Sequence, residues 1–97
     1  MSITYVAVCH EKRETIDPGK IGGGANTGYF VYFGAANVVA HAMLNRWYGH
    51  GVSIEPDGDH EVAERIDGYS DVTREAIEAY NASRPVSVTS VKFEERG

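Results

Sequence analysis

The side chains best suited to chemistry in this chain are one cysteine and four histidines, spread over residues 9–60. Cys9 and His10 are adjacent, and adjacent residues in a strand point to opposite faces. They therefore cannot act together as nucleophile and base while a strand runs through both. The fold could still bring Cys9 to His41 or His50. A small enzyme that uses Cys9, His41 or His50 is thus one alternative that the sequence leaves open.

The same histidines do not match the spacing of a known metal site. His41 and His50 are nine positions apart with Gly49 between them, and the chain has neither an H-E-x-x-H pattern nor paired cysteines. Carboxylates stand at every second position of 57–61, as they do in a calcium-binding loop. The stretch lacks the glycine at the position that such a loop requires and the glutamate at its far end. We predict no catalytic set, no metal ligands and no cofactor, although a metal-dependent enzyme with a ligand from 57–61 remains part of the enzyme alternative.

A glycine-rich stretch at 15–28 invites comparison with loops that bind phosphate through backbone N–H groups. No serine or threonine follows Lys20, and the stretch precedes a predicted strand, whereas the known phosphate loops precede a helix. Asp17-Pro18-Gly19 and the later glycines instead favour a flexible connector over 15–28.

Negative charge is concentrated in the second half of the chain. The net charge is −5, and residues 51–97 hold eleven acids against five Lys/Arg, whereas residues 1–50 hold three acids against four. Within 55–78 nine carboxylates are opposed only by Arg65 and Arg74. The absence of a Lys/Arg cluster disfavours direct nucleic-acid binding. The acidic stretch is either a solvated face or a surface complementary to a basic partner.

Exposed aromatic side chains would strengthen such a surface, because Tyr and Trp are preferred interface anchors. The leading hypothesis is a small acidic cytosolic protein-binding module that inhibits or regulates a nucleic-acid-handling partner by occupying its basic surface. In size and charge the chain is similar to many phage-encoded inhibitors of bacterial defence systems. No sequence motif carries this similarity. The predicted contact residues are Glu55, Asp57, Asp59, Glu61, Glu64, Asp67, Trp47 and Tyr48.

The longest apolar pattern lies at 29–49. Residues 29–33 are all aromatic or β-branched, which predicts a buried strand. After Gly34 a helix is predicted over 35–49, with an apolar face that we assign to Ala36, Val39, Ala40, Met43 and Trp47. Asn37, His41 and Asn45 repeat every four residues and form a polar stripe, either on the solvent face or in contact with polar partners.

The remaining elements are shorter. Strands are predicted at 3–9, apolar on both faces and hence central, at 51–54 and at 86–93. The turn at 55–59 favours a hairpin strand at 60–66, although that stretch also fits helical spacing. A second helix should begin after an N-cap at Ser70 or Asp71 and end at Arg84-Pro85.

Together these elements predict one α+β domain over 1–97, a mixed sheet of about four to five strands with two helices on one face. No apolar run reaches the roughly 20 residues of a membrane span, and no secretory signal is evident, so we expect a cytoplasmic protein without membrane contact. A third hypothesis for function is a structural homodimer that pairs through an edge strand at 86–93.

Overall fold

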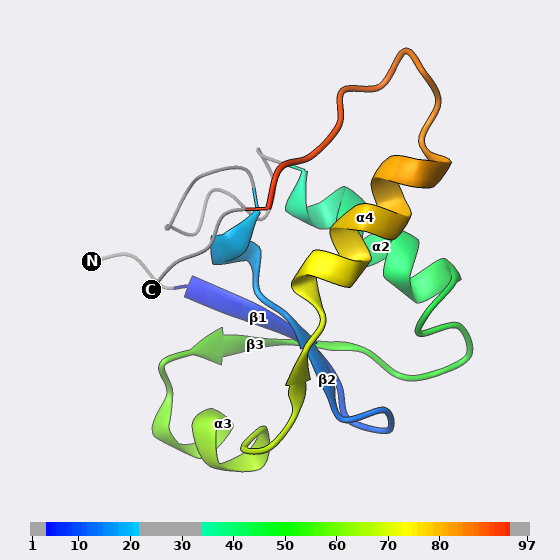
Figure 1. The fold of residues 1–97 in the computed structure, drawn as a ribbon. Coiled ribbons are helices and arrows are strands. Elements are labelled where there is room, and N and C mark those ends of the chain that lie inside the picture. Colours follow the sequence, from blue (N-terminus) through cyan, green and yellow to red (C-terminus); the bar gives the residue numbers. More distant parts are fainter. Residues whose placement is uncertain (1–3, 22–33, 94–97) are drawn as a thin grey trace.

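Strand β1 (Thr4–Cys9) lies in the middle of the sheet in the computed structural model, which describes residues 4–21 and 34–93. Its antiparallel neighbours are β2 (Glu14–Ile16) and β3 (Ser53–Asp57), and β4 (Ser70–Asp71) pairs with β2 in parallel. The strand order is β3-β1-β2-β4 (Figure 1). The predicted mixed sheet and the central position of the first strand are both confirmed.

The two faces of β1 pack against different helices. Ala7 and Cys9 belong to the larger core, which includes buried residues of α2 (Ala35–Leu44) and α4 (Thr73–Ser83). Val6 and Val8 alternate with them and pack with Val62 of α3 (His60–Arg65) in a smaller cluster. The two predicted helices therefore share one face of the sheet, and a third helix covers the other.

Helix α3 corrects the prediction of a hairpin strand at 60–66. The Asp59 carboxylate accepts hydrogen bonds from the backbone N–H groups of Glu61 (2.9 Å) and Val62 (3.2 Å), so it caps the helix. Gly58, with φ of 91°, makes the turn that the Pro-Asp-Gly sequence predicts. The turn is shorter than the predicted 55–59, because β3 continues to Asp57, and it leads into a helix N-terminus because Asp59 follows it.

The apolar face of α2 was only partly predicted: of the five assigned residues, Val39 and Trp47 are buried. Ala35, Val38, Val39 and Ala42 are buried, whereas Ala36, Ala40 and Met43 are exposed. The prediction treated Trp47 as part of the same helix and placed the apolar face in line with it, but the helix ends at Leu44. Trp47 then enters the core from the following turn, where its backbone N–H donates to the carbonyl of Ala42 at 2.7 Å.

The stretch at 15–28, predicted to be a flexible connector, is ordered in its first part. Thr15 and Ile16 are buried in β2, and Pro18–Lys20 forms a 3-10 helix, η1, capped by Asp17. The free energy gained by burying these side chains exceeds the conformational entropy lost when this part of the chain is ordered. Residues 22–28 and the predicted strand at 29–33 lie outside the described residues.

Helix α4 begins at Thr73, two residues after Asp71, and ends at Ser83 before Arg84-Pro85 as predicted. The N-cap is Val72, which makes no side-chain capping bond, and not Ser70 or Asp71 as predicted. The Asp71 side chain lies one residue earlier, and its Oδ1 accepts from the backbone N–H of Thr73 at 2.9 Å.

The strand predicted at 86–93 does not form within the described part of the chain, where only Phe93 makes an isolated bridge with Ile21. The Asn81 side chain accepts from the Val91 backbone N–H (2.9 Å) and donates to the Val91 carbonyl (2.8 Å). These bonds satisfy backbone groups that would otherwise need a neighbouring strand. The edge strand that the homodimer hypothesis uses is therefore not formed in this part of the described chain.

Candidate functional site

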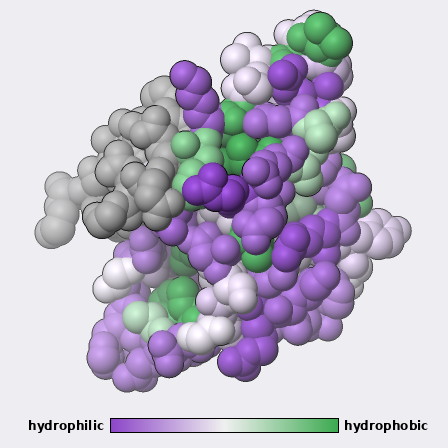
Figure 2. Space-filling view, in the orientation of Figure 1, coloured by the Kyte–Doolittle hydropathy of each residue, from purple (hydrophilic) through white to green (hydrophobic). Residues whose placement is uncertain are grey.

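Five of the eight predicted contact residues lie together on one exposed segment, 57–67, which we call the acidic lobe. It comprises the end of β3, helix α3 and the turn after it. Hydrophilic residues predominate at this end of the molecule (Figure 2). The exposed carboxylates are those of Asp57, Asp59, Glu61, Glu64 and Asp67.

The other three predicted contact residues lie elsewhere. Tyr48 is 74% exposed, but it belongs to the turn after α2 and not to the lobe. Trp47 is fully buried, and its indole N–H donates to Glu14 at 2.9 Å. Glu55 is 9% exposed. The side chains of Trp47 and Glu55 are therefore buried within the fold and are not exposed for contact with a partner.

Negative charge exceeds positive charge within the lobe. Residues 57–67 hold five carboxylates and one arginine, and that arginine, Arg65, donates to Glu55 of β3 at 2.7 Å. His60 contacts Glu64 at 3.0 Å, an exposed pair one helical turn apart. Exposed pairs of this kind contribute little. The lobe thus carries five exposed carboxylates against one arginine, which also interacts electrostatically with Glu61 and Asp59.

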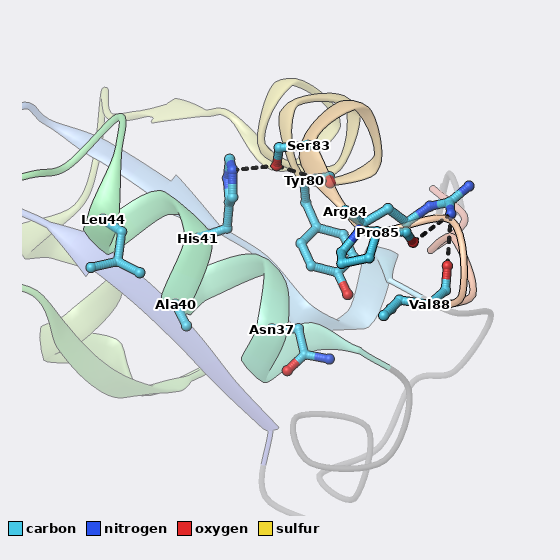
Figure 3. A pocket seen from close by; sticks show the side chains of 9 residues that line it. All are labelled: Asn37, Ala40, His41, Leu44, Tyr80, Ser83, Arg84, Pro85 and Val88. Carbon is cyan, nitrogen blue, oxygen red and sulfur yellow. Dashed lines mark hydrogen bonds between the residues drawn. The ribbon is translucent and has the colours of Figure 1, made fainter.

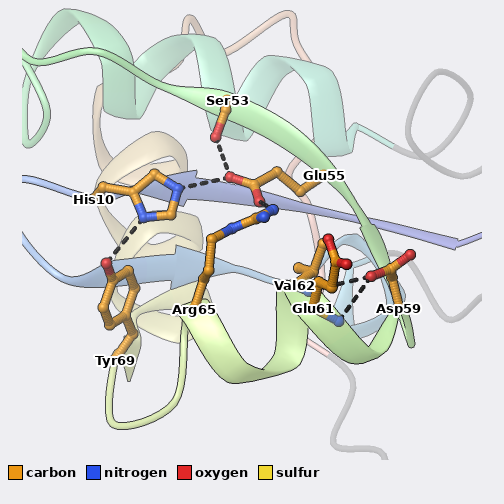
Figure 4. Close-up of polar contacts among 8 residues, drawn as sticks. All are labelled: His10, Ser53, Glu55, Asp59, Glu61, Val62, Arg65 and Tyr69. Carbon is orange, nitrogen blue, oxygen red and sulfur yellow. Dashed lines mark hydrogen bonds and ion pairs between the residues drawn. The ribbon is translucent and has the colours of Figure 1, made fainter.

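Glu55 anchors the lobe to the sheet (Figure 4). It lies opposite Val6 in the β1–β3 ladder, and Val6 packs toward α3, so Glu55 also faces α3. Its carboxylate accepts hydrogen bonds from Ser53 Oγ (2.5 Å), Arg65 Nη2 (2.7 Å) and His10 Nε2 (2.7 Å).

These donors, Ser53 first and then Arg65 and His10, outweigh burial and lower the pKa of the Glu55 carboxyl from 4.5 to about 2. Glu55 is therefore ionised at neutral pH and can only accept hydrogen bonds.

His10 links this carboxylate to a phenol. Its Nδ1 lies 2.9 Å from the hydroxyl oxygen of Tyr69, and the two rings meet edge to face with centroids 5.6 Å apart. Because Glu55 only accepts, the proton of a neutral imidazole is on Nε2 and Nδ1 carries a lone pair. The Tyr69 hydroxyl then donates to Nδ1. The order phenol, imidazole, carboxylate is the arrangement of a nucleophile, its base and the group that orients the base.

Two arginines adjoin this cluster. The guanidinium carbon of Arg13 lies 5.1 Å from the centre of the Tyr69 ring, close enough for a cation–π contact. Arg65, whose side chain is 54% exposed, binds Glu55 through one of its nitrogens. Sequence reasoning missed the cluster, because His10 and Glu55 are 45 positions apart and His10 and Tyr69 are 59 apart. Only the strand pairing brings them together.

A second candidate site is a groove of about 400 Å³ between α2 and α4 (Figure 3). Asn37 and His41, two members of the predicted polar stripe, line it together with Tyr80 and Ser83 of α4. The third member, Asn45, donates to the backbone carbonyl of His41 at 2.9 Å. Apolar atoms complete the lining, from Ala40, Leu44, Pro85 and Val88.

The Ser83–His41 pair in this groove is less well arranged for chemistry. Ser83 Oγ lies 2.7 Å from His41 Nε2, but also 3.1 and 3.3 Å from the carbonyl oxygens of Ala79 and Tyr80. Carbonyls only accept, so the arrangement that satisfies these groups has the Ser83 hydroxyl donating to the helix and His41 donating to Ser83. In that state the imidazole is no base for the hydroxyl.

The other residues of the enzyme alternative are dispersed. Cys9 is completely buried in β1, and His50 Nδ1 lies 3.4 Å from Glu11. Across residues 4–21 and 34–93, no three or more His, Cys, Asp or Glu side chains are grouped to hold a metal ion. No helix in the same ranges has both the length and the apolar character to cross a membrane. Comparisons with protein-family models, curated proteins and solved structures find no match for this chain.

Proposed function

We propose that this protein is a small binding module that docks its acidic lobe onto the basic surface of a protein partner and thereby inhibits or regulates that partner. The observation that supports this proposal is the set of five exposed carboxylates on the lobe, where the single arginine, Arg65, is hydrogen-bonded to Glu55 of the sheet. A basic surface of the kind that holds nucleic acid would be complementary to it. The proposal places the protein in the cytoplasm, where such partners act.

The position of Arg65 is central to the argument. Arg65 interacts electrostatically with Glu61, but its guanidinium hydrogen-bonds Glu55 on the sheet. The lobe is thereby fixed to β3 while its outer carboxylates remain available. Fixed charges bind with less loss of conformational freedom than charges on a flexible tail. A rigid array of one sign also accelerates encounter with a partner of the opposite sign.

The test reverses charge on the lobe without breaking its internal bonds. Asp57 and Glu61 are exposed and neither side chain caps a helix, whereas Asp59 caps α3 and Glu64 contacts His60. We expect the Asp57→Lys/Glu61→Lys protein to lose the partner that the unsubstituted protein captures from native cytoplasm at low salt. Capture should also be lost in about 1 M salt, where the Debye length is about 3 Å.

The matched control changes the net charge equally at another place. Glu75 and Glu78 are exposed on α4, so the Glu75→Lys/Glu78→Lys protein carries the same total charge as the lobe variant. It should retain the partner. Binding that survives both high salt and reversal of the lobe, or equal loss in the control, would refute a lobe-specific function.

A further inference from the structure

The cluster of Tyr69, His10 and Glu55 has features that binding by the acidic lobe does not use. Because Glu55 is ionised, His10 Nε2 donates to it, and when the imidazole is neutral the phenol donates to Nδ1. The His10 side chain is 42% exposed, so a small molecule can reach this end of the cluster from solvent.

We propose that Tyr69 is an activated nucleophile that reacts through its phenol oxygen with donors of sulfonyl or phosphoryl groups, with His10 as its general base. Glu55 is a positioning residue, which holds the His10 ring with Nδ1 toward the phenol. Ser53 and Arg65 in turn fix Glu55, with contacts of 2.5 and 2.7 Å.

The reaction is a group transfer to oxygen. The Tyr69 oxygen forms a bond to the sulfur or phosphorus of the donor, and the bond from that atom to its leaving group breaks with both electrons. The phenol proton moves to Nδ1 of His10, and the resulting imidazolium is stabilised by the Glu55 carboxylate at 2.7 Å. The proton then passes to solvent or to the leaving group. No oxidant or reductant is needed.

The neighbouring arginines define the class of donor. Guanidinium groups suit the oxygens of phosphoryl and sulfonyl groups, because their N–H donors are planar and permanently charged. Arg13 lies over the Tyr69 ring, and Arg65 is half exposed with only one nitrogen bound to Glu55. Both cations would also stabilise the negative charge that develops as the phenol loses its proton.

The test measures labelling of individual tyrosines by benzenesulfonyl fluoride, with the rate at each site obtained by peptide mass spectrometry. Tyr48 is the internal reference, because it is 74% exposed and therefore freely accessible. General-base assistance typically contributes at least about 100-fold, so Tyr69 should react about 100-fold faster than Tyr48. Tyr69→Phe verifies the assignment of the labelled site.

The variant His10→Gln distinguishes a role of His10 as a general base from a role in which it only holds Tyr69 and Glu55 by hydrogen bonds. A glutamine amide can still donate to Glu55 and accept from Tyr69, but it cannot take up a proton at neutral pH. We expect circular dichroism to remain unchanged and the Tyr69 rate to fall to that of Tyr48.

Equal rates for Tyr69 and Tyr48 in the unsubstituted protein would overturn the proposal, and so would an unchanged Tyr69 rate in folded His10→Gln protein. Should His10→Gln not fold, the ratio in the unsubstituted protein decides alone.

Discussion

Replacing Glu55 by glutamine removes one charge from the cluster that joins the acidic lobe to the sheet. Glutamine has nearly the same shape and keeps one side-chain oxygen, so the change tests charge more than packing. Arg65 stays half exposed and is not left as a buried unpaired cation. The loss should therefore be the electrostatic part of the bonds from Ser53, Arg65 and His10 to Glu55.

The magnitude follows from the pKa of Glu55, which falls from 4.5 to about 2 on folding. At about 1.4 kcal/mol per tenfold change, the charged form adds about 3 kcal/mol to the free energy of unfolding at pH 7. Because the pKa is lowered in the folded state, this stabilisation is complete above pH 4.5 and declines as the pH falls toward 2. Glu55→Gln should thus lower the melting temperature by roughly 10 to 25 °C at pH 7.

The assay is urea unfolding followed by the fluorescence of Trp47, the single tryptophan, at pH 7 and pH 3. The difference in free energy between the two proteins should be about 3 kcal/mol at pH 7 and about 1.5 kcal/mol at pH 3. Other carboxylates titrate in both proteins and cancel in the difference. A difference below about 1 kcal/mol at pH 7, or one that does not change with pH, would refute the electrostatic explanation.

Two further substitutions test the packing that positions the sheet and helices. Trp47→Phe removes the hydrogen bond to Glu14 and part of a buried ring. It should lower the free energy of unfolding by roughly 1 to 3 kcal/mol, measured by thermal unfolding. An unchanged melting temperature would contradict a stabilising role for this hydrogen bond and the buried ring. Gly34→Ala places a Cβ 2.6 Å from Val91 at φ of +90° and should destabilise more than Gly58→Ala, where φ is +91° but nothing lies within 4 Å. Equal effects of the two alanines would exclude a clash with Val91.

Local sequence signals were enough where the fold follows local rules. The first strand was predicted because apolar residues occupy both of its faces, and it is indeed covered on both sides. The end of helix α4 was predicted from Arg84-Pro85, and the helix does end at Ser83. Such signals need no knowledge of distant parts of the chain.

The errors occurred where distant residues decide the outcome. The stretch at 86–93 has the composition of a strand, but the side chain of Asn81 takes the place of a neighbouring backbone at Val91. Glu55 was predicted to be an exposed acid, because the residues next to it in the sequence do not reveal that its side chain faces α3. Its burial depends on the register of β3 against β1, which composition does not reveal.

The candidate sites follow the same division. The carboxylates of the acidic lobe lie close together in the sequence, all within 57–67, so their common exposure could be anticipated from the acidic composition of that segment. In the other cluster, the imidazole of His10 directly follows β1, the carboxylate of Glu55 belongs to β3, and the phenol of Tyr69 lies in the turn before β4. No spacing rule connects three such segments, and only the assembled sheet places them in contact.

Hydrogen exchange of the partner complex tests the central claim, binding through the acidic lobe, most directly. With the partner captured at low salt, backbone amides of 57–67 should exchange more slowly in the complex than in the free protein. Those of α4 should be unchanged. Slower exchange confined to α2 and α4, with the acidic lobe as exposed as before, would contradict the claim.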